Sequence, residues 1–262
     1  METPHLSAFL HCPAWEQHLL DQTKQVIAQP EGLYTRHSLP ASRWHKGQYW
    51  QANRLNIQPG WQLPPLPQRP WFIRLQAQDF LGHQALTYFL TNNQIAHVRV
   101  PSYQPKQTQF LDLRQNLDQI LDQMKPKHRY NIKVAEKNGL QVEIIQHQLF
   151  EALPRFLHIL EETNARHGLI AHPRAHYASI LKALEPEHQA WLVFAKLGSK
   201  DIATAMIIVC GEVGTYLHGG SDYTQRAQMA PYLMHYQIIQ ALKEQGAHYY
   251  DLWGTNAVSS PD

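Results

Sequence analysis

Basic side chains gather in one stretch of the sequence, where they could bind phosphate groups. Arg129, Lys133 and Lys137 are spaced four residues apart, so they share one face of a predicted helix. Such a stripe can hold the phosphates of a small substrate or of the acceptor stem of a tRNA. The alternative, which the spacing leaves open, is a solvated helix face with no ligand.

Three polar side chains lie in or at the end of predicted strands. Tyr216 and His218 are two residues apart, so we expect them to point to the same side of the sheet. Asp251 comes at the end of a later strand, and it is the one candidate for a catalytic residue. A carboxylate there could orient an incoming amine, but it could equally cap or pair structurally, and we favour the structural role.

The sequence offers no convincing metal site. His167, His172 and His176 are close in sequence, but Pro173 interrupts the helical spacing that would bring them together, so we expect no bound metal. The chain has two cysteines, which cannot supply a disulfide framework or a four-thiolate zinc site.

Composition narrows the class of protein further. Of the 262 residues, 44% are hydrophobic and 17% are charged, which fits a folded protein and not a disordered one. A net charge of +2 excludes a nucleic-acid binder that depends on bulk charge, but it allows a local basic patch. We see no signal peptide and no window near the roughly 18 apolar residues of a membrane span, so we expect a cytoplasmic protein.

The elements that position these side chains are clearest after Pro105. Before it, the chain is rich in Trp, Pro and Gln, with a helix predicted over 14–27 and strand material near 47–50, 55–57 and 71–75. After it, apolar spacing and Gly or Pro breaks predict a longer series of elements. These are helices over 117–124, 127–138, 149–166, 176–184 and 231–245, strands over 140–145, 190–196, 202–209, 215–218 and 248–253, and a polar loop over 219–229.

Three stretches resemble the Fem family of peptidoglycan interpeptide-bridge aminoacyltransferases, covering about residues 104–254 well and 1–103 loosely. They are the string Met124-Lys125-Pro126-Lys127-His128-Arg129-Tyr130-Asn131-Ile132-Lys133-Val134-Ala135-Glu136-Lys137-Asn138-Gly139-Leu140, the pair Glu162-Thr163 with His167-Gly168, and Tyr216-Leu217-His218-Gly219-Gly220-Ser221 with Met229-Ala230-Pro231-Tyr232-Leu233 and Tyr250-Asp251-Leu252-Trp253-Gly254. The resemblance implies an α/β (α+β) fold of two GNAT-like domains with mixed, mostly antiparallel sheets. We place these domains at 1–115 and 116–262, the second without its last helix and strands.

The resemblance also implies a reaction. Members move an amino acid from aminoacyl-tRNA, the donor substrate, to an amine on the stem peptide of a peptidoglycan precursor, either lipid II or its nucleotide-linked form. Attack of an amine on an ester needs a positioned amine, loss of its proton and donors for the developing oxyanion. It needs no cofactor and no metal. The partners implied are aminoacyl-tRNA, the precursor and peripheral contact with the inner face of the cytoplasmic membrane.

Binding residues follow from the matched motifs. Relatives carry an Arg and then a Tyr that help to hold the precursor's phosphate end; Tyr177 matches, His172 replaces the Arg, and Arg174 could substitute for it. Relatives also have a Tyr-x-Tyr pair facing the acceptor peptide, of which Tyr216 matches and His218 departs. The substrate-binding residues implied are Arg129, Lys133, His172, Arg174, Tyr177, Tyr216, His218 and Ser221.

Departures from the family leave two alternatives open. Gln76 stands where relatives often have an acid, and the family's Phe-Lys-x-Gly-Phe motif has no counterpart before Asp262. We therefore expect a truncated or shortened relative that turns over slowly and associates through a sheet edge exposed at 250–253. The alternatives are a non-catalytic binding protein and a generic N-acyltransferase with another acyl donor; residues 225–230 lack the glycines of a phosphate cradle, which disfavours acetyl-CoA.

Overall fold

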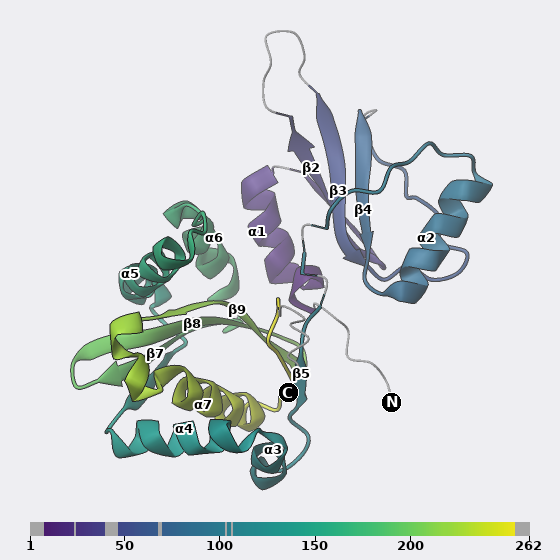
Figure 1. The fold of residues 1–262 in the computed structure, drawn as a ribbon. Coiled ribbons are helices and arrows are strands. Elements are labelled where there is room, and N and C mark those ends of the chain that lie inside the picture. The colour runs from purple at the N-terminus through teal and green to yellow at the C-terminus, as the bar shows by residue number, and fades with distance from the viewer. Residues whose placement is uncertain are drawn as a thin grey trace. The chain divides into compact units, whose positions relative to one another are not determined.

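The chain folds as two compact units, each built on its own mixed sheet. The computed structural model describes residues 8–23, 25–39, 47–67, 70–102, 104–105 and 107–254. Residues 1–7, on which the expectation about a signal peptide falls, lie outside it. The units are Met1–Lys106 and Gln107–Asp262 (Figure 1). Their division comes before the expected boundary at residue 115, because residues 110–112 pair within the sheet of the second unit.

The first unit has a four-stranded sheet in the order β1-β2-β3-β4, in which β4 is parallel to β3 and the other pairs are antiparallel. Its elements are η1 (Ala8–His11), α1 (Pro13–Thr23), β1 (Val26–Gln29), β2 (Gly32–Ser38), β3 (Gln48–Leu55), β4 (Phe72–Ala77) and α2 (Phe80–Asn92). The helix expected over 14–27 is too long, because Val26 pairs with Thr35 and starts β1. Its β-branched side chain favours that extended backbone.

The second unit has a six-stranded sheet in the order β5-β10-β9-β8-β7-β6. Its elements are β5 (Phe110–Asp112), α3 (Leu117–Gln123), α4 (Pro126–Lys137), β6 (Gln141–Ile145), α5 (Leu149–His167), α6 (Arg174–Leu184), β7 (Ala190–Leu197), β8 (Lys200–Cys210), β9 (Val213–Ser221), η2 (Tyr223–Gln228), α7 (Ala230–Glu244) and β10 (Tyr249–Asp251). The expected helices and strands after Pro105 are present, whereas much of the predicted polar loop is the 3₁₀ helix η2. Helices α4 and α7 lie on one face of the sheet, and α5 and α6 lie on the other (Figure 1).

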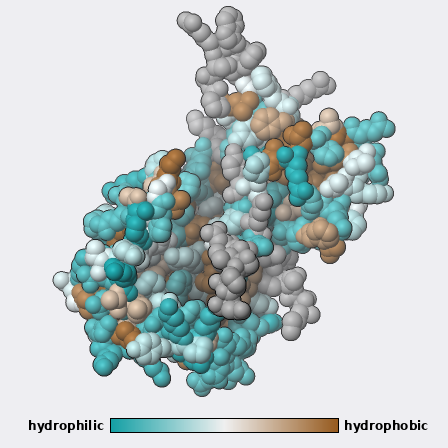
Figure 2. All heavy atoms as spheres, viewed as in Figure 1, coloured by the Kyte–Doolittle hydropathy of each residue, from teal (hydrophilic) through white to brown (hydrophobic). Residues whose placement is uncertain are grey.

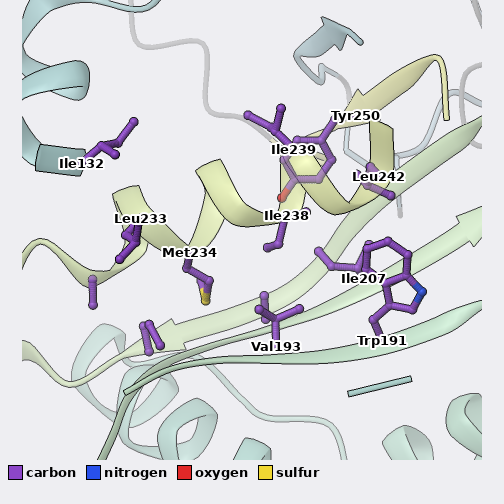
Figure 3. Close-up of a cluster of buried hydrophobic side chains, with 14 of the residues drawn as sticks. Ile132, Trp191, Val193, Ile207, Leu233, Met234, Ile238, Ile239, Leu242 and Tyr250 are labelled. Atoms are coloured by element: carbon purple, nitrogen blue, oxygen red, sulfur yellow. The ribbon is translucent and has the colours of Figure 1, made fainter. Parts of the chain in front are cut away.

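The core of the second unit forms between α7 and the sheet. Side chains of β7 and β8, among them Val193 and Ile207, are fully buried against Ile238 and Leu242 of α7 (Figure 3). Burying a side chain of this size contributes about 1.5–3 kcal/mol. Pro is tolerated in the first turn of a helix, where α7 has Pro231, so packing and local sequence agree on where this helix starts.

The expectation of an exposed sheet edge at residues 250–253 is wrong. β10 pairs in parallel with β9 on one side and antiparallel with β5 on the other, so it is an internal strand. The segment that protects it, Phe110–Asp112, comes from the start of this unit. No described helix is both long and apolar enough to cross a membrane.

Candidate active site

Strands β9 and β10 run together and then part. Their pairing extends from Val213 opposite Tyr249 to Thr215 opposite Asp251, where β10 ends, while β9 continues to Ser221. At the same point β9 has a bulge: Met206 of β8 faces His218 and Ile207 faces Tyr216, so one residue of β9 is extra. A bulge of this kind re-aims the side chains on either side of it.

Because of the bulge, Tyr216 and His218 point to opposite faces of the sheet, contrary to the expectation from their spacing. The Tyr216 ring lies 4.8 Å from the ring of His235, which belongs to α7. The His218 ring lies 5.2 Å from the ring of Tyr177, which belongs to α6. Tyr216 and His218 therefore belong to two separate groups of side chains, one on each face of the sheet.

On the α7 face, Tyr216 joins two residues that the sequence did not single out. His235 Nδ1 and the Tyr250 hydroxyl are hydrogen-bonded at 2.8 Å. Burial lowers the pKa of His235 to about 4 and raises the pKa of Tyr216 to about 12, so both are neutral near pH 7. A Cβ at Gly219 would overlap the Tyr216 hydroxyl, so the absent side chain makes room for that ring.

The one feature of the sequence that could have pointed to His235 is its spacing within α7. It precedes Ile238 and Leu242 by three and seven residues, which places it on the helix face that the core covers. A lone polar residue at such a position needs a partner, and Tyr250 supplies it. Tyr250 itself is fully buried, and burial raises its pKa.

On the α6 face, three imidazoles gather around Tyr177. The rings of His172 and His176 are 4.3 Å apart, and they lie 6.1 and 6.2 Å from the ring of His218. Burial, and then the neighbouring His176 and His172, lower the pKa of His218 to about 3. Among the described residues, no three His, Cys, Asp or Glu side chains are placed to hold a metal ion. Arg174 is exposed at the first residue of α6.

The predicted basic stripe of α4 divides into two kinds of residue. Arg129 Nη1 donates to the carbonyl oxygens of Leu121, Asp122 and Met124 at 3.1, 3.1 and 2.6 Å, so it caps the C-terminal end of α3. Lys133, in contrast, is exposed. The structure thus gives Arg129 a structural role, while phosphate binding by this face stays a prediction.

A cavity of about 500 Å³ lies at the start of α7. Its wall includes Ser221 at the end of β9, Arg226 of η2 and Tyr232 of α7. The guanidinium of Arg226 lies 4.4 Å from the centre of the Tyr223 ring, and that of Arg166 lies 5.2 Å from it. The exposed Tyr223 is therefore an aromatic platform with cations beside it.

Asp251 lies where β10 ends, and it is completely buried. Its Oδ1 accepts hydrogen bonds from the Thr108 hydroxyl and from the Trp253 backbone N–H, the latter at 2.8 Å. These bonds fix the chain at the point where β9 and β10 part. They are what a structural carboxylate would make, and a catalytic role for Asp251 stays a prediction.

A mixed sheet whose neighbouring parallel strands part beside the start of a helix defines an N-acyltransferase fold. The acetyltransferase (GNAT) domain family matches residues 126–258, and the chain belongs to this family. The crystal structure of FemX is similar, with a TM-score of 0.64 and 15% identity over 97% of this chain and 85% of that one. So is the C-terminal domain (DUF2156) of a putative lysylphosphatidylglycerol synthetase from Agrobacterium fabrum, with a TM-score of 0.52 and 14% identity over 91% and 72%.

At these identities the two likenesses show the fold alone. No curated protein matches the sequence significantly. The family and the fold make the second unit an acyltransferase domain, and the identity of the acyl group depends on the site itself.

Proposed function

We propose that the protein transfers an aminoacyl group from aminoacyl-tRNA to an amine, and that the amine belongs to the stem peptide of a peptidoglycan precursor. The observation that carries the donor part is the segment between β9 and α7. It is a 3₁₀ helix without glycine, and two guanidinium groups lie beside its Tyr223, that of Arg226 in the same segment and that of Arg166 from α5. Side-chain cations next to an aromatic ring suit a single-stranded RNA end, whose bases stack and whose phosphates need charge.

The start of α7 fits this donor better than it fits a pyrophosphate held by backbone amides. Met229 has a left-handed backbone with φ of 57° and makes no side-chain cap. Pro231 has no N–H to offer, so the first turn presents fewer donors than a glycine-rich cradle would. The resemblance of residues 104–254 to the Fem family supports the acceptor part of the proposal.

In the proposed reaction, the nitrogen of the acceptor attacks the ester carbonyl, a C–N bond forms and the bond to the ribose oxygen breaks. Tyr216 gives its proton to the leaving oxygen and receives one from the amine, so it ends protonated as it began. Its raised pKa keeps the hydroxyl protonated before the step. The ring of His235, held by Tyr250, positions Tyr216 for this exchange.

The donor and the acceptor reach this point from opposite faces of the sheet in this proposal. The cavity at the start of α7 takes the end of the tRNA. On the α6 face the imidazoles of His172, His176 and His218 contact the acceptor, and the buried Tyr177 packs behind them. The two meet where β9 continues past the end of β10.

The test is single-turnover transfer of a labelled amino acid from tRNA to the precursor, with acetyl-CoA as a competing donor. We expect transfer from aminoacyl-tRNA only. Arg226→Ala should weaken tRNA binding and reduce its salt dependence by about one unit of slope. The matched control is Arg114→Ala, since Arg114 pairs at 2.6 Å with Asp112 of β5, and it should leave both unchanged.

A second candidate is N-acyl transfer from another activated donor, which the acetyltransferase family match favours. Transfer from acetyl-CoA without tRNA would establish this candidate and reject the first. Binding of both substrates without any transfer would instead indicate a non-catalytic binding protein. Transfer from tRNA to some other amine would support aminoacyl-tRNA as the donor and contradict the peptidoglycan precursor as the acceptor.

A further inference from the structure

The exposed hydrophobic side chains of the chain are concentrated in one part of the first unit. Most of the large ones that the structure describes fall between residues 71 and 100, at the start of β4, in α2 and in the segment after α2. Figure 2 shows hydrophobic residues gathered over β4 and α2. We call this set the apolar surface; its members are Trp71, Phe72, Phe80, Leu81, Tyr88, Ile95, Val98 and Val100.

Helix α2 has apolar side chains on two sides, and only one of these sides packs into the core of the first unit. Gly82 and Leu86 are buried on the side that packs on β4. Phe80, Leu81 and Tyr88 are 72%, 72% and 69% exposed. At about 100° per residue these three lie within an arc of about 100°, so they form one outward stripe. An outward stripe of this kind marks an interaction surface.

Within the segment that carries the apolar surface, cations outnumber acids. Between residues 71 and 100 there is one acidic residue, Asp79, and it caps α2 by accepting a hydrogen bond from the Gly82 N–H at 2.8 Å. The cations are Arg74 and Arg99, and His83 and His97 of the same segment are exposed. Exposed aromatic and aliphatic side chains in a segment with two arginines, whose one acid is taken up by a helix cap, are what a negatively charged lipid surface attracts.

We infer that the first unit docks on an anionic lipid bilayer through the apolar surface. The charge favours this occupant over a second copy of the chain, because a second copy would offer the two arginines only the one acid, Asp79, which already caps α2. A helix side with outward-pointing rings also suits a bilayer, into which each side chain inserts separately. A protein partner would need a complementary shape against it. This inference does not depend on the reaction that the second unit performs.

Sedimentation with lipid vesicles tests the inference. The full chain should pellet with phosphatidylglycerol–phosphatidylcholine vesicles and much less with phosphatidylcholine alone. Phe80→Ser with Leu81→Ser should reduce binding to the anionic vesicles at least about tenfold, because two side chains that enter the bilayer are lost. The matched control is Leu169→Ser with Ile170→Ser in the second unit, where the two side chains are 62% and 99% exposed, and it should bind as the unchanged chain does.

Circular dichroism and a thermal melt should show that both double variants fold. Equal binding by the α2 variant and the control would overturn the inference, as would failure of the unchanged chain to bind any vesicle. A concentration-dependent dimer that the α2 substitutions abolish, without vesicle binding, would also overturn it and assign the surface to a second copy.

Discussion

The two faces of β9 present different chemistry although they belong to one strand. On the α7 face, Tyr216 lies against the hydrogen-bonded pair of His235 and Tyr250. The lowered pKa of His235 keeps that imidazole neutral near pH 7. On the α6 face, His218 and Tyr177 meet through their rings, with two more imidazoles beside them. The first arrangement suits proton transfer and the second suits contact with a ligand. A single extra residue in the strand separates them, because without the bulge both side chains would share a face.

The largest expected effect that tests this comparison comes from Tyr216→Phe. The change removes the hydroxyl and keeps the ring, so the single-turnover transfer rate should fall about 100-fold or more, as when a general acid is lost. The measurement is the single-turnover rate at saturating substrates, with a thermal melt to show that folding is unaffected. His218→Phe should instead weaken acceptor binding and leave the saturated rate within a few-fold. Equal losses of the saturated rate in both variants would contradict the assignment of proton transfer to one face and acceptor binding to the other.

Neighbouring glycines provide a test of intermediate size. An added Cβ at Gly219 would overlap the Tyr216 hydroxyl, whereas at Gly220 it would lie 2.5 Å from Thr163 Oγ1 and 3.1 Å from the Ile159 carbonyl oxygen, both on α5. Gly219→Ala should therefore reduce the transfer rate per folded molecule while changing the free energy of unfolding little. Gly220→Ala should lower the free energy of unfolding by about 1–3 kcal/mol, because α5 must shift. Urea unfolding and transfer rates per folded molecule measure the two, and the reverse pattern would contradict the assignment of faces.

The smallest effect is a pH dependence of stability from the α6 face. The pKa of His218 is lowered to about 3 from an ordinary 6.5, so as pH falls the unfolded chain takes up the proton first. The associated stability is complete above about pH 6.5 and is lost progressively as pH falls from there toward 3, at no more than about 1.4 kcal/mol per pH unit. Urea unfolding at pH 7.0 and 5.5 should show this loss, and His218→Phe should reduce it. An unchanged slope in that variant would mean that His218 is not the group responsible.

The sequence indicates most elements of the second unit because each is bounded by a local signal. Pro231 marks the start of α7, and glycines such as Gly139 and Gly246 follow the ends of helices. Helix α2 was missed because apolar residues on two of its sides weaken the 3.6-residue period. β5 was missed because three residues carry little pattern, and they are a strand only through their pairing with β10.

The candidate site was predictable in its parts and not in its arrangement. Tyr177 and His218 were named from the sequence, and the structure brings them together. The separation of Tyr216 from His218 was not predictable, because the bulge depends on the register with β8 and not on the residues of β9 alone. The cap that Arg129 makes on α3 could not be read either, since its acceptors are backbone carbonyls.

The pairing of β5 with β10 has a consequence for how the second unit forms during synthesis. Phe110–Asp112 leaves the ribosome early, yet the partner residues Tyr249–Asp251 come last in this sheet. Local hairpins such as β7–β8 and β8–β9 can close as soon as they are made, but β5 must wait for a contact that is distant in sequence, and such contacts form slowly. Until then β5 of the growing chain is unpaired, and we expect chaperones to bind, or the chain to associate wrongly, during this interval.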